Sequence, residues 1–178
     1  MGKEGLTPLE ERAFTHMRVR AFRPEDGERL GIIFYRSVRE GGRRGYSREQ
    51  VEAWAVSVPP ASLYKTKAGD GRMLLVTVDD RDKPIAYGDL EPNGHIDHLF
   101  CPDAIGTGAA SKLYDHLERQ AHDWHIGRIF VEASELARPF FAHKGFTLLQ
   151  RHDFIMRGVP MHHYWMEKLL SGQARPQT

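Results

Sequence analysis

The chain has 178 residues, of which 40% are hydrophobic and 28% charged, which is typical of a soluble globular domain. Its 25 Lys and Arg residues against 24 Asp and Glu residues leave a formal net charge of +1, which gives no field to attract nucleic acid or an anionic membrane surface. No apolar run approaches the roughly 20 residues that a membrane helix requires. The N-terminus lacks the apolar core of a secretory signal, and the single cysteine cannot form an internal disulfide. We therefore expect a cytoplasmic protein that binds neither nucleic acid nor membrane.

The first half of the chain predicts one strand and two helices inside a single domain of residues 17–170. Residues 1–16 are polar without a period, so we expect an N-terminal arm or leader there, and residues 171–178 a flexible tail. Apolar and basic side chains alternate over residues 17–22, as in a half-buried strand. A helix with one apolar face follows as far as the glycines at 41 and 42, and Ser47 with Gln50 predicts the capping box of a second, short helix that ends at two prolines.

The second half predicts more strands than helices. Turn-rich segments separate three apolar runs that form an antiparallel meander, and helical spacing alternates with strand-like runs after it. Together with the first half, this order predicts a mixed α+β sheet with helices on its faces. The expected elements are strands at 73–78, 84–91 and 94–101, a helix at 110–121, a strand at 128–133, a helix at 135–143, and a hairpin of strands at 146–153 and 160–166.

The most informative stretch is a strand, a turn of small residues and an amphipathic helix over residues 96–114. Gly106, Gly108, Ala109 and Ala110 allow a phosphate group to approach the backbone, and the first amides of the helix then point at it with the positive end of the helix dipole behind them. The turn lacks the Gly-Lys-Ser/Thr ending of a Walker loop and the third glycine of a dinucleotide fingerprint. It therefore predicts a pyrophosphate-binding site that belongs to neither of these two motifs.

This turn resembles the acetyl-CoA motif of the GNAT superfamily of N-acetyltransferases, Gln/Arg-x-x-Gly-x-Gly/Ala. In Ile105-Gly-Thr-Gly-Ala-Ala110, Gly108 takes the glycine position and Ala110 the Gly/Ala position, while Ile105 stands where the family has Gln or Arg. Because the family's phosphate contacts come largely from backbone amides, we expect the loss of this side chain to lower affinity without abolishing the site.

A second family motif, Asn-x-x-Ala-x-x-Phe-Tyr-x-x-x-Gly-Phe, resembles residues 134–146. Ser134 replaces the family's Asn, and Phe141 replaces the Tyr that protonates the departing thiolate in many members. The segments Arg157-Gly-Val and Met166-Glu-Lys near the C-terminus are similar to a poorly characterised bacterial subfamily. The agreeing positions of the second motif are Ala137, Phe140, Gly145 and Phe146.

The resemblance, which spans roughly residues 17 to 168, implies a GNAT-like fold with a mostly antiparallel, twisted sheet of about seven strands and helices on both faces. It also implies transfer of an acetyl group from acetyl-CoA to a primary amine of a small molecule or protein by direct attack in a ternary complex. The residues it implies at acetyl-CoA are Leu99, Phe100, Cys101, Ile105, Gly106, Thr107, Gly108, Ala109, Ala110, Ser111, Ser134 and Phe141.

The reaction requires a base, because an alkylamine with a pKa of about 10.4 is mostly protonated at neutral pH. His95 and Asp97 alternate onto one face of the fourth strand and are our candidates. If Cys101 is the last apolar position of that strand, His95 falls where some family members carry a catalytic carboxylate. If Phe100 is that position, Gly94 falls there and no candidate remains.

The other candidates carry less chemistry. Cys101 lacks the context of a nucleophile, and the paired histidines do not converge on one ion by spacing alone, so we expect no metal. In the superfamily the region around Trp54 and Arg44 covers the acceptor. The alternative function is an acyl-CoA-binding module with impaired catalysis that acts as a sensor or interaction domain, which Ile105 and Phe141 favour. A homodimer is compatible with the sequence.

Overall fold

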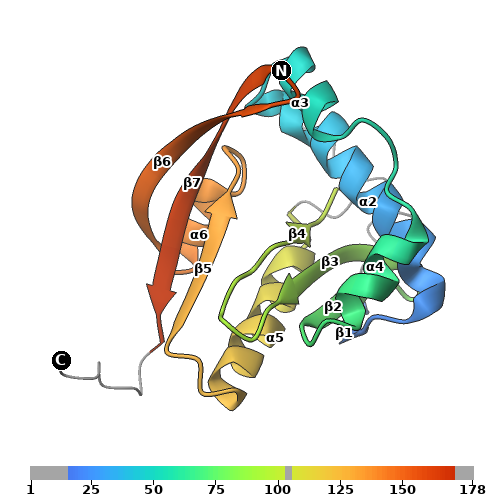
Figure 1. Cartoon of the computed structure of the whole chain (residues 1–178). Helices are drawn as coiled ribbons and strands as arrows, with labels where there is room; N and C mark the ends of the chain where they lie inside the picture. Colours follow the sequence, from blue (N-terminus) through green and yellow to red (C-terminus); the bar gives the residue numbers. More distant parts are fainter. Residues whose placement is uncertain (1–15, 103–105, 171–178) are drawn as a thin grey trace.

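The computed structural model describes residues 16–102 and 106–170. Within these residues, seven strands form two antiparallel sheets that lie side by side (Figure 1). The strand order is β1-β2-β3-β4 in the N-terminal sheet and β5-β7-β6 in the C-terminal sheet. The mixed α+β class is therefore confirmed. The expected tail and all of the expected arm except His16 lie outside the described residues.

The N-terminal sheet is covered on both faces, and its central strand β3 is buried at every position. Alternation sends Leu75 and Ala86 toward α5, and Val76 and Tyr87 toward α2 and α4. The elements of this half are β1 (Arg18–Ala21), η1 (Pro24–Asp26), α2 (Gly27–Arg39), η2 (Gly41–Arg44), α3 (Arg48–Trp54), α4 (Ala61–Ala68), β2 (Met73–Val78), β3 (Pro84–Leu90) and β4 (Leu99–Phe100).

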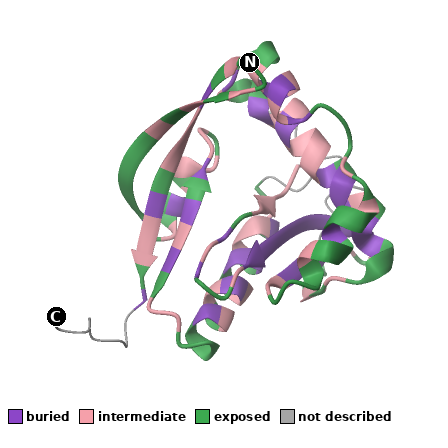
Figure 2. Cartoon of the chain, in the orientation of Figure 1, coloured by how far each residue is buried: buried purple, intermediate pink, exposed green. Residues whose placement is uncertain are grey.

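The C-terminal sheet is more exposed. Its inner face packs on helices α5 and α6 through Val131 and Met166, whereas most side chains of β6 reach solvent (Figure 2). The elements of this half are α5 (Ala109–Asp123), β5 (Arg128–Ala133), α6 (Arg138–His143), β6 (Thr147–Met156) and β7 (Val159–Leu169).

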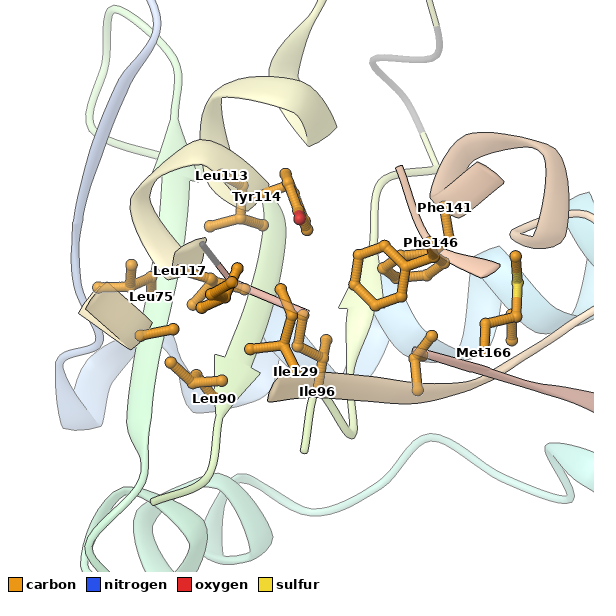
Figure 3. Close-up of a cluster of buried hydrophobic side chains, with 14 of the residues drawn as sticks. Leu75, Leu90, Ile96, Leu113, Tyr114, Leu117, Ile129, Phe141, Phe146 and Met166 are labelled. Carbon is orange, nitrogen blue, oxygen red and sulfur yellow. The ribbon is translucent and has the colours of Figure 1, made fainter. Parts of the chain in front are cut away.

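One hydrophobic core joins the two sheets. Leu75 and Leu90 from the N-terminal sheet, Leu117 of α5, and Ile129 and Met166 from the C-terminal sheet belong to one buried cluster, in which Leu75 lies at one end and Met166 at the other (Figure 3). Helix α5 therefore acts as a common support, because its buried face contacts both sheets.

In the part of the chain that the structure describes, the sheets share backbone hydrogen bonds at one place, which we call the junction: residues 94–96 and Phe130. The Ile96 N–H donates to the Phe130 carbonyl oxygen (2.9 Å) and the Phe130 N–H to the Gly94 carbonyl oxygen (3.0 Å). This parallel pairing ends there, because beyond the junction β4 pairs with β3 and β5 pairs with β7. Gly94 has φ +93, and a Cβ on it would lie 2.1 Å from the Arg128 carbonyl oxygen, so the close approach requires glycine.

Most predicted elements are confirmed, including the capping box of Ser47 and Gln50. The strand predicted over 94–101 is wrong as one continuous strand, because it contains an irregularity and forms β4 only at Leu99–Phe100. The helix predicted over 135–143 begins later, at Arg138. Helix α4 was missed, since only Tyr64 of it is buried and no apolar stripe marks it in the sequence.

Candidate functional site

A cavity of about 440 Å³ lies where β4 separates from β5, between the start of α5, the start of α6 and the α2–α3 region. Three stretches distant in sequence form its walls. Its lining residues are Ser37, Val38, Gly41, Gly42, Arg44, Tyr46, Trp54, Leu99, Phe100, Cys101, Pro102, Gly106, Gly108, Ala110, Ser111, Ser134, Leu136, Ala137 and Phe140.

The α5 wall is suited to an anion. Gly106 and Gly108 both have φ +84, and a Cβ on either would have no atom of the described residues within 4 Å, so residues 16–102 and 106–170 leave free space beside the backbone of this turn. Gly108 caps α5, and the first-turn amides of Ala110 and Ser111 have no acceptor within the helix. Because these amides and the positive end of the helix dipole meet at the cavity, the residues present fit a phosphate group.

The β4 wall offers backbone hydrogen-bonding groups. Gly88 of β3 lies opposite Leu99, and the neighbouring pairs are Tyr87 with Phe100 and Asp89 with His98, the last joined by a hydrogen bond from the Asp89 N–H to the His98 carbonyl oxygen (3.0 Å). Since opposed residues of an antiparallel ladder alternate between bonded and non-bonded pairs, the Leu99 N–H and carbonyl point away from β3. Leu99 also lines the cavity.

The third wall brings two aromatic side chains against the end of β5. The rings of Tyr46 and Trp54 pack edge to face with centroids 5.6 Å apart. The Tyr46 hydroxyl donates to the His162 carbonyl oxygen (3.0 Å) and accepts from the Glu135 N–H (2.9 Å). Burial raises the pKa of Tyr46. Trp54 is the part of this wall that the sequence led us to expect near the acceptor, whereas Tyr46 was not predicted, because its hydrogen bonds are to residues 89 and 116 positions away in the chain.

His95 lies at the junction between two carboxylates. Its Nε2 is 2.5 Å from a Glu132 oxygen, its Nδ1 is 3.5 Å from a Glu91 oxygen, and its ring stacks on Phe130 with centroids 5.0 Å apart. Burial alone would lower the pKa of His95, but the hydrogen bond and charge of Glu132, with the charge of Glu91, outweigh burial and raise this pKa above its usual 6.5.

Asp97, the other candidate base, is held in ion pairs. Its carboxylate contacts Lys67 and lies 3.2 Å from Arg72. Burial opposes ionisation, but His98, Lys67 and Arg72 outweigh it and lower the pKa of Asp97 to about 2. Asp97 also converges with Asp89 and His98 into a group that could hold a metal ion, yet the two cations already occupy its carboxylates.

The structure brings eight of the predicted site residues together around the cavity. His95 and Asp97 do not line it, and neither do Thr107, Ala109 or Phe141; Ile105 lies outside the described residues. Phe141 is 1% exposed and packs in the core, while its neighbour Phe140 faces the cavity. The eight lining residues are Leu99, Phe100, Cys101, Gly106, Gly108, Ala110, Ser111 and Ser134.

Two antiparallel sheets that separate beside a glycine turn and a helix N-terminus define a class of acyl-transfer folds, and comparison with known proteins identifies the family. Residues 43–168 match the family model of the acetyltransferase (GNAT) domain. The chain belongs to this family, as its two motifs led us to expect.

Individual relatives agree with the family. The chain is 26% identical over 152 residues to the uncharacterized N-acetyltransferase YafP of Escherichia coli K12. The aligned residues make up 85% of this chain and 95% of YafP. A GCN5-related N-acetyltransferase from Rhodopseudomonas palustris has a similar structure, with a TM-score of 0.79 and 29% identity over 88% of this chain and 97% of that one.

A more distant structural relative was solved with its cofactor. YncA from Salmonella typhimurium, in complex with acetyl-CoA, has a TM-score of 0.69 and 16% identity, covering 92% of this chain and 99% of that one. At this identity the likeness concerns the fold. No helix in the described part of the present chain is long and apolar enough to cross a bilayer.

Proposed function

We propose that the protein transfers the acetyl group of acetyl-CoA to a primary amine of a small molecule or protein, by direct attack in a ternary complex. The observation that carries this proposal is the single cavity shared by the start of α5 and the outward-facing backbone of β4. One extended ligand could therefore place its pyrophosphate at the start of α5 and its thioester beside β4.

Acetyl-CoA would supply an activated acetyl group on a sulfur atom. Gly106, Gly108, Ala110 and Ser111 would hold its pyrophosphate through backbone amides, so an isoleucine at 105 in place of Gln or Arg leaves these donors in place. The Leu99 N–H would donate to the carbonyl oxygen, on which negative charge develops during transfer.

In the transfer, the amine nitrogen forms a bond to the carbonyl carbon, the carbon–sulfur bond breaks, and the amine gives up a proton. We assign the proton to His95 rather than to Asp97, because the pKa of Asp97 near 2 makes that carboxylate a poor base. Since His95 does not line the cavity, the proton would pass to it through a water molecule. Glu132 orients the imidazole. Phe141 has no hydroxyl to protonate the sulfur, but a thiol with a pKa of about 8.5 leaves readily as an anion.

The alternative is an acyl-CoA-binding module without turnover, which the buried Phe141 favours. The two functions differ in one measurement. An acetyltransferase releases free CoA steadily when an amine is supplied, and the release stops when the amine is used up. A binding module takes up acetyl-CoA and releases no CoA with any amine.

The first experiment is a calorimetric titration of acetyl-CoA into the wild type and into Gly108→Trp, whose indole would fill the space beside the α5 turn. We expect binding to the wild type and at least tenfold weaker binding to the variant. Gly158→Trp is the matched control, because Gly158 also has a positive φ (+79) with no atom within 4 Å and lies in the β6–β7 turn. Equal binding to all three proteins would refute the proposed site.

A further inference from the structure

The β4 segment contains one residue more than the stretch of β3 that it faces. The Asp89 N–H donates to the His98 carbonyl oxygen (3.0 Å), and the Glu91 N–H donates to the His95 carbonyl oxygen (2.8 Å). Two steps along β3, from 89 to 91, therefore match three steps along the facing segment, from 95 to 98. The extra residue makes a β-bulge at Asp97 and His98.

The bulge determines which way the Leu99 N–H points. The Ile96 N–H bonds across to β5. In a regular strand the direction alternates, so the N–H groups of residues 98 and 100 would face β5 and that of Leu99 would face β3. The bulge shifts this alternation by one residue, and the Leu99 N–H consequently faces the cavity.

A bulge leaves consecutive backbone N–H groups on one side, and both of them need an acceptor. Here the acceptor is one side-chain oxygen. Asp89 Oδ1 accepts from the Asp97 N–H (3.0 Å) and from the His98 N–H (2.8 Å). The Asp89 side chain is fully buried, so no exposed conformation competes with this arrangement.

The positive charge of Arg72 offsets the unfavourable burial of the Asp89 carboxylate. Its guanidinium lies 2.9 Å from Asp89 Oδ2, opposite the oxygen that holds the bulge. Arg72 is itself 10% exposed and is fixed by Asp70 (2.8 Å) and Glu91 (3.0 Å). The carboxylate is thus held at both oxygens, with one used for charge pairing and the other for the backbone of the bulge.

We propose that Asp89 is a positioning residue for acetyl transfer: through the bulge at Asp97 and His98, it aims the Leu99 N–H at the thioester carbonyl oxygen. Asp89 touches neither substrate and acts through the backbone. This inference rests on the proposed function, since it assigns the orientation of the donor that the transfer uses.

The test compares Asp89→Asn with Asp26→Asn. Asparagine cannot keep both arrangements, because its NH2 group must face either two backbone N–H donors or the Arg72 guanidinium. Asp26 is the matched control: it is 5% exposed, pairs with Arg20 (2.8 Å) and accepts from the Arg23 N–H (2.8 Å), but it lies beside β1, at the opposite edge of the sheet from β4.

Three quantities are measured on each protein: kcat, the affinity for CoA, and the 13C chemical shift of the bound acetyl carbonyl, using acetyl-CoA labelled at that carbon. For Asp89→Asn we expect kcat to fall about ten- to hundredfold, less than the loss of a whole donor. We expect the carbonyl signal to move toward its free position, and the affinity for CoA, which has no carbonyl there, to stay within about twofold. Asp26→Asn should match the wild type in all three.

An unchanged kcat and carbonyl shift in folded Asp89→Asn would overturn the proposal, and so would equal losses in the two variants. Should Asp89→Asn fail to fold, hydrogen exchange in the wild type decides: the Asp97 and His98 amides should exchange slowly, and exchange as fast as in an exposed loop would refute the bulge contacts. If the wild type transfers no acetyl group but shows the carbonyl shift, the proposed function fails, while the orientation of the Leu99 N–H toward the carbonyl oxygen is supported.

Discussion

The two sheets of this protein are built from strands of different character. Every residue of β3 in the N-terminal sheet is buried, because helices cover both of its faces, whereas β6 in the C-terminal sheet is exposed along most of its length (Figure 2). The cavity lies between them, where neither sheet pairs with the other. A well-packed sheet thus supplies the fixed backbone, and the separation of a second sheet supplies the space for a ligand.

The largest effect is expected at the junction, where the sheets meet. Gly94→Ala combines a positive φ of +93 with a Cβ 2.1 Å from the Arg128 carbonyl oxygen, so we expect a loss of about 3–5 kcal/mol in the free energy of unfolding. Urea denaturation measures this loss. Gly71→Ala is the control, since Gly71 has φ +96 but its nearest neighbour is 4.0 Å away, and it should lose about 1 kcal/mol. Equal losses would mean that the junction is not a close contact.

A smaller effect separates the core side of the C-terminal sheet from its exposed strand. Ile129 of β5 is fully buried, whereas Ile155 of β6 is 67% exposed. Removing one methyl group by Ile129→Val should cost about 0.5–1.5 kcal/mol, and Ile155→Val less than about 0.5 kcal/mol. A thermal or urea unfolding series on the two variants checks the difference, and a cost at Ile155 as large as at Ile129 would indicate that β6 is covered in solution.

Of these substitutions, Glu132→Gln should change the free energy of unfolding least, but it should change the pH dependence of kcat/KM. Because the pKa of His95 is raised above 6.5, His95 stays protonated to higher pH, so kcat/KM should rise with pH as His95 loses its proton and level off above this raised pKa. The variant loses a hydrogen bond and a charge that favour the imidazolium, so the rising limb should move to lower pH. A pH profile of kcat/KM over both proteins tests this; a limb that does not move would remove His95 from the proton transfer.

The parts of the site that sequence analysis found are those in which neighbouring residues carry the chemistry. Gly106, Gly108 and Ala110 form one turn, and their pattern alone indicates a helix N-terminus open to a phosphate. Tyr46 was missed because its wall of the cavity is made by contacts with Glu135 and His162, which only the folded chain brings together.

The bulge at Asp97 and His98 explains why the predicted strand over 94–101 was wrong as a regular strand. The segment has apolar and polar residues in a strand-like order, and nothing in that order marks the extra residue. The bulge depends on a carboxylate of the neighbouring strand, Asp89, which pattern analysis treats as one more polar position. Side-chain-to-backbone contacts of this kind are not visible in periodicity.

The central claim is that the ligand lies between the sheets, along β4 and the start of α5. Amide hydrogen exchange with and without acetyl-CoA tests it most directly. We expect new protection at Leu99, Cys101, Ala110 and Ser111, with β6 unchanged. Protection on the β6–β7 hairpin in place of these amides, or no change anywhere, would contradict it.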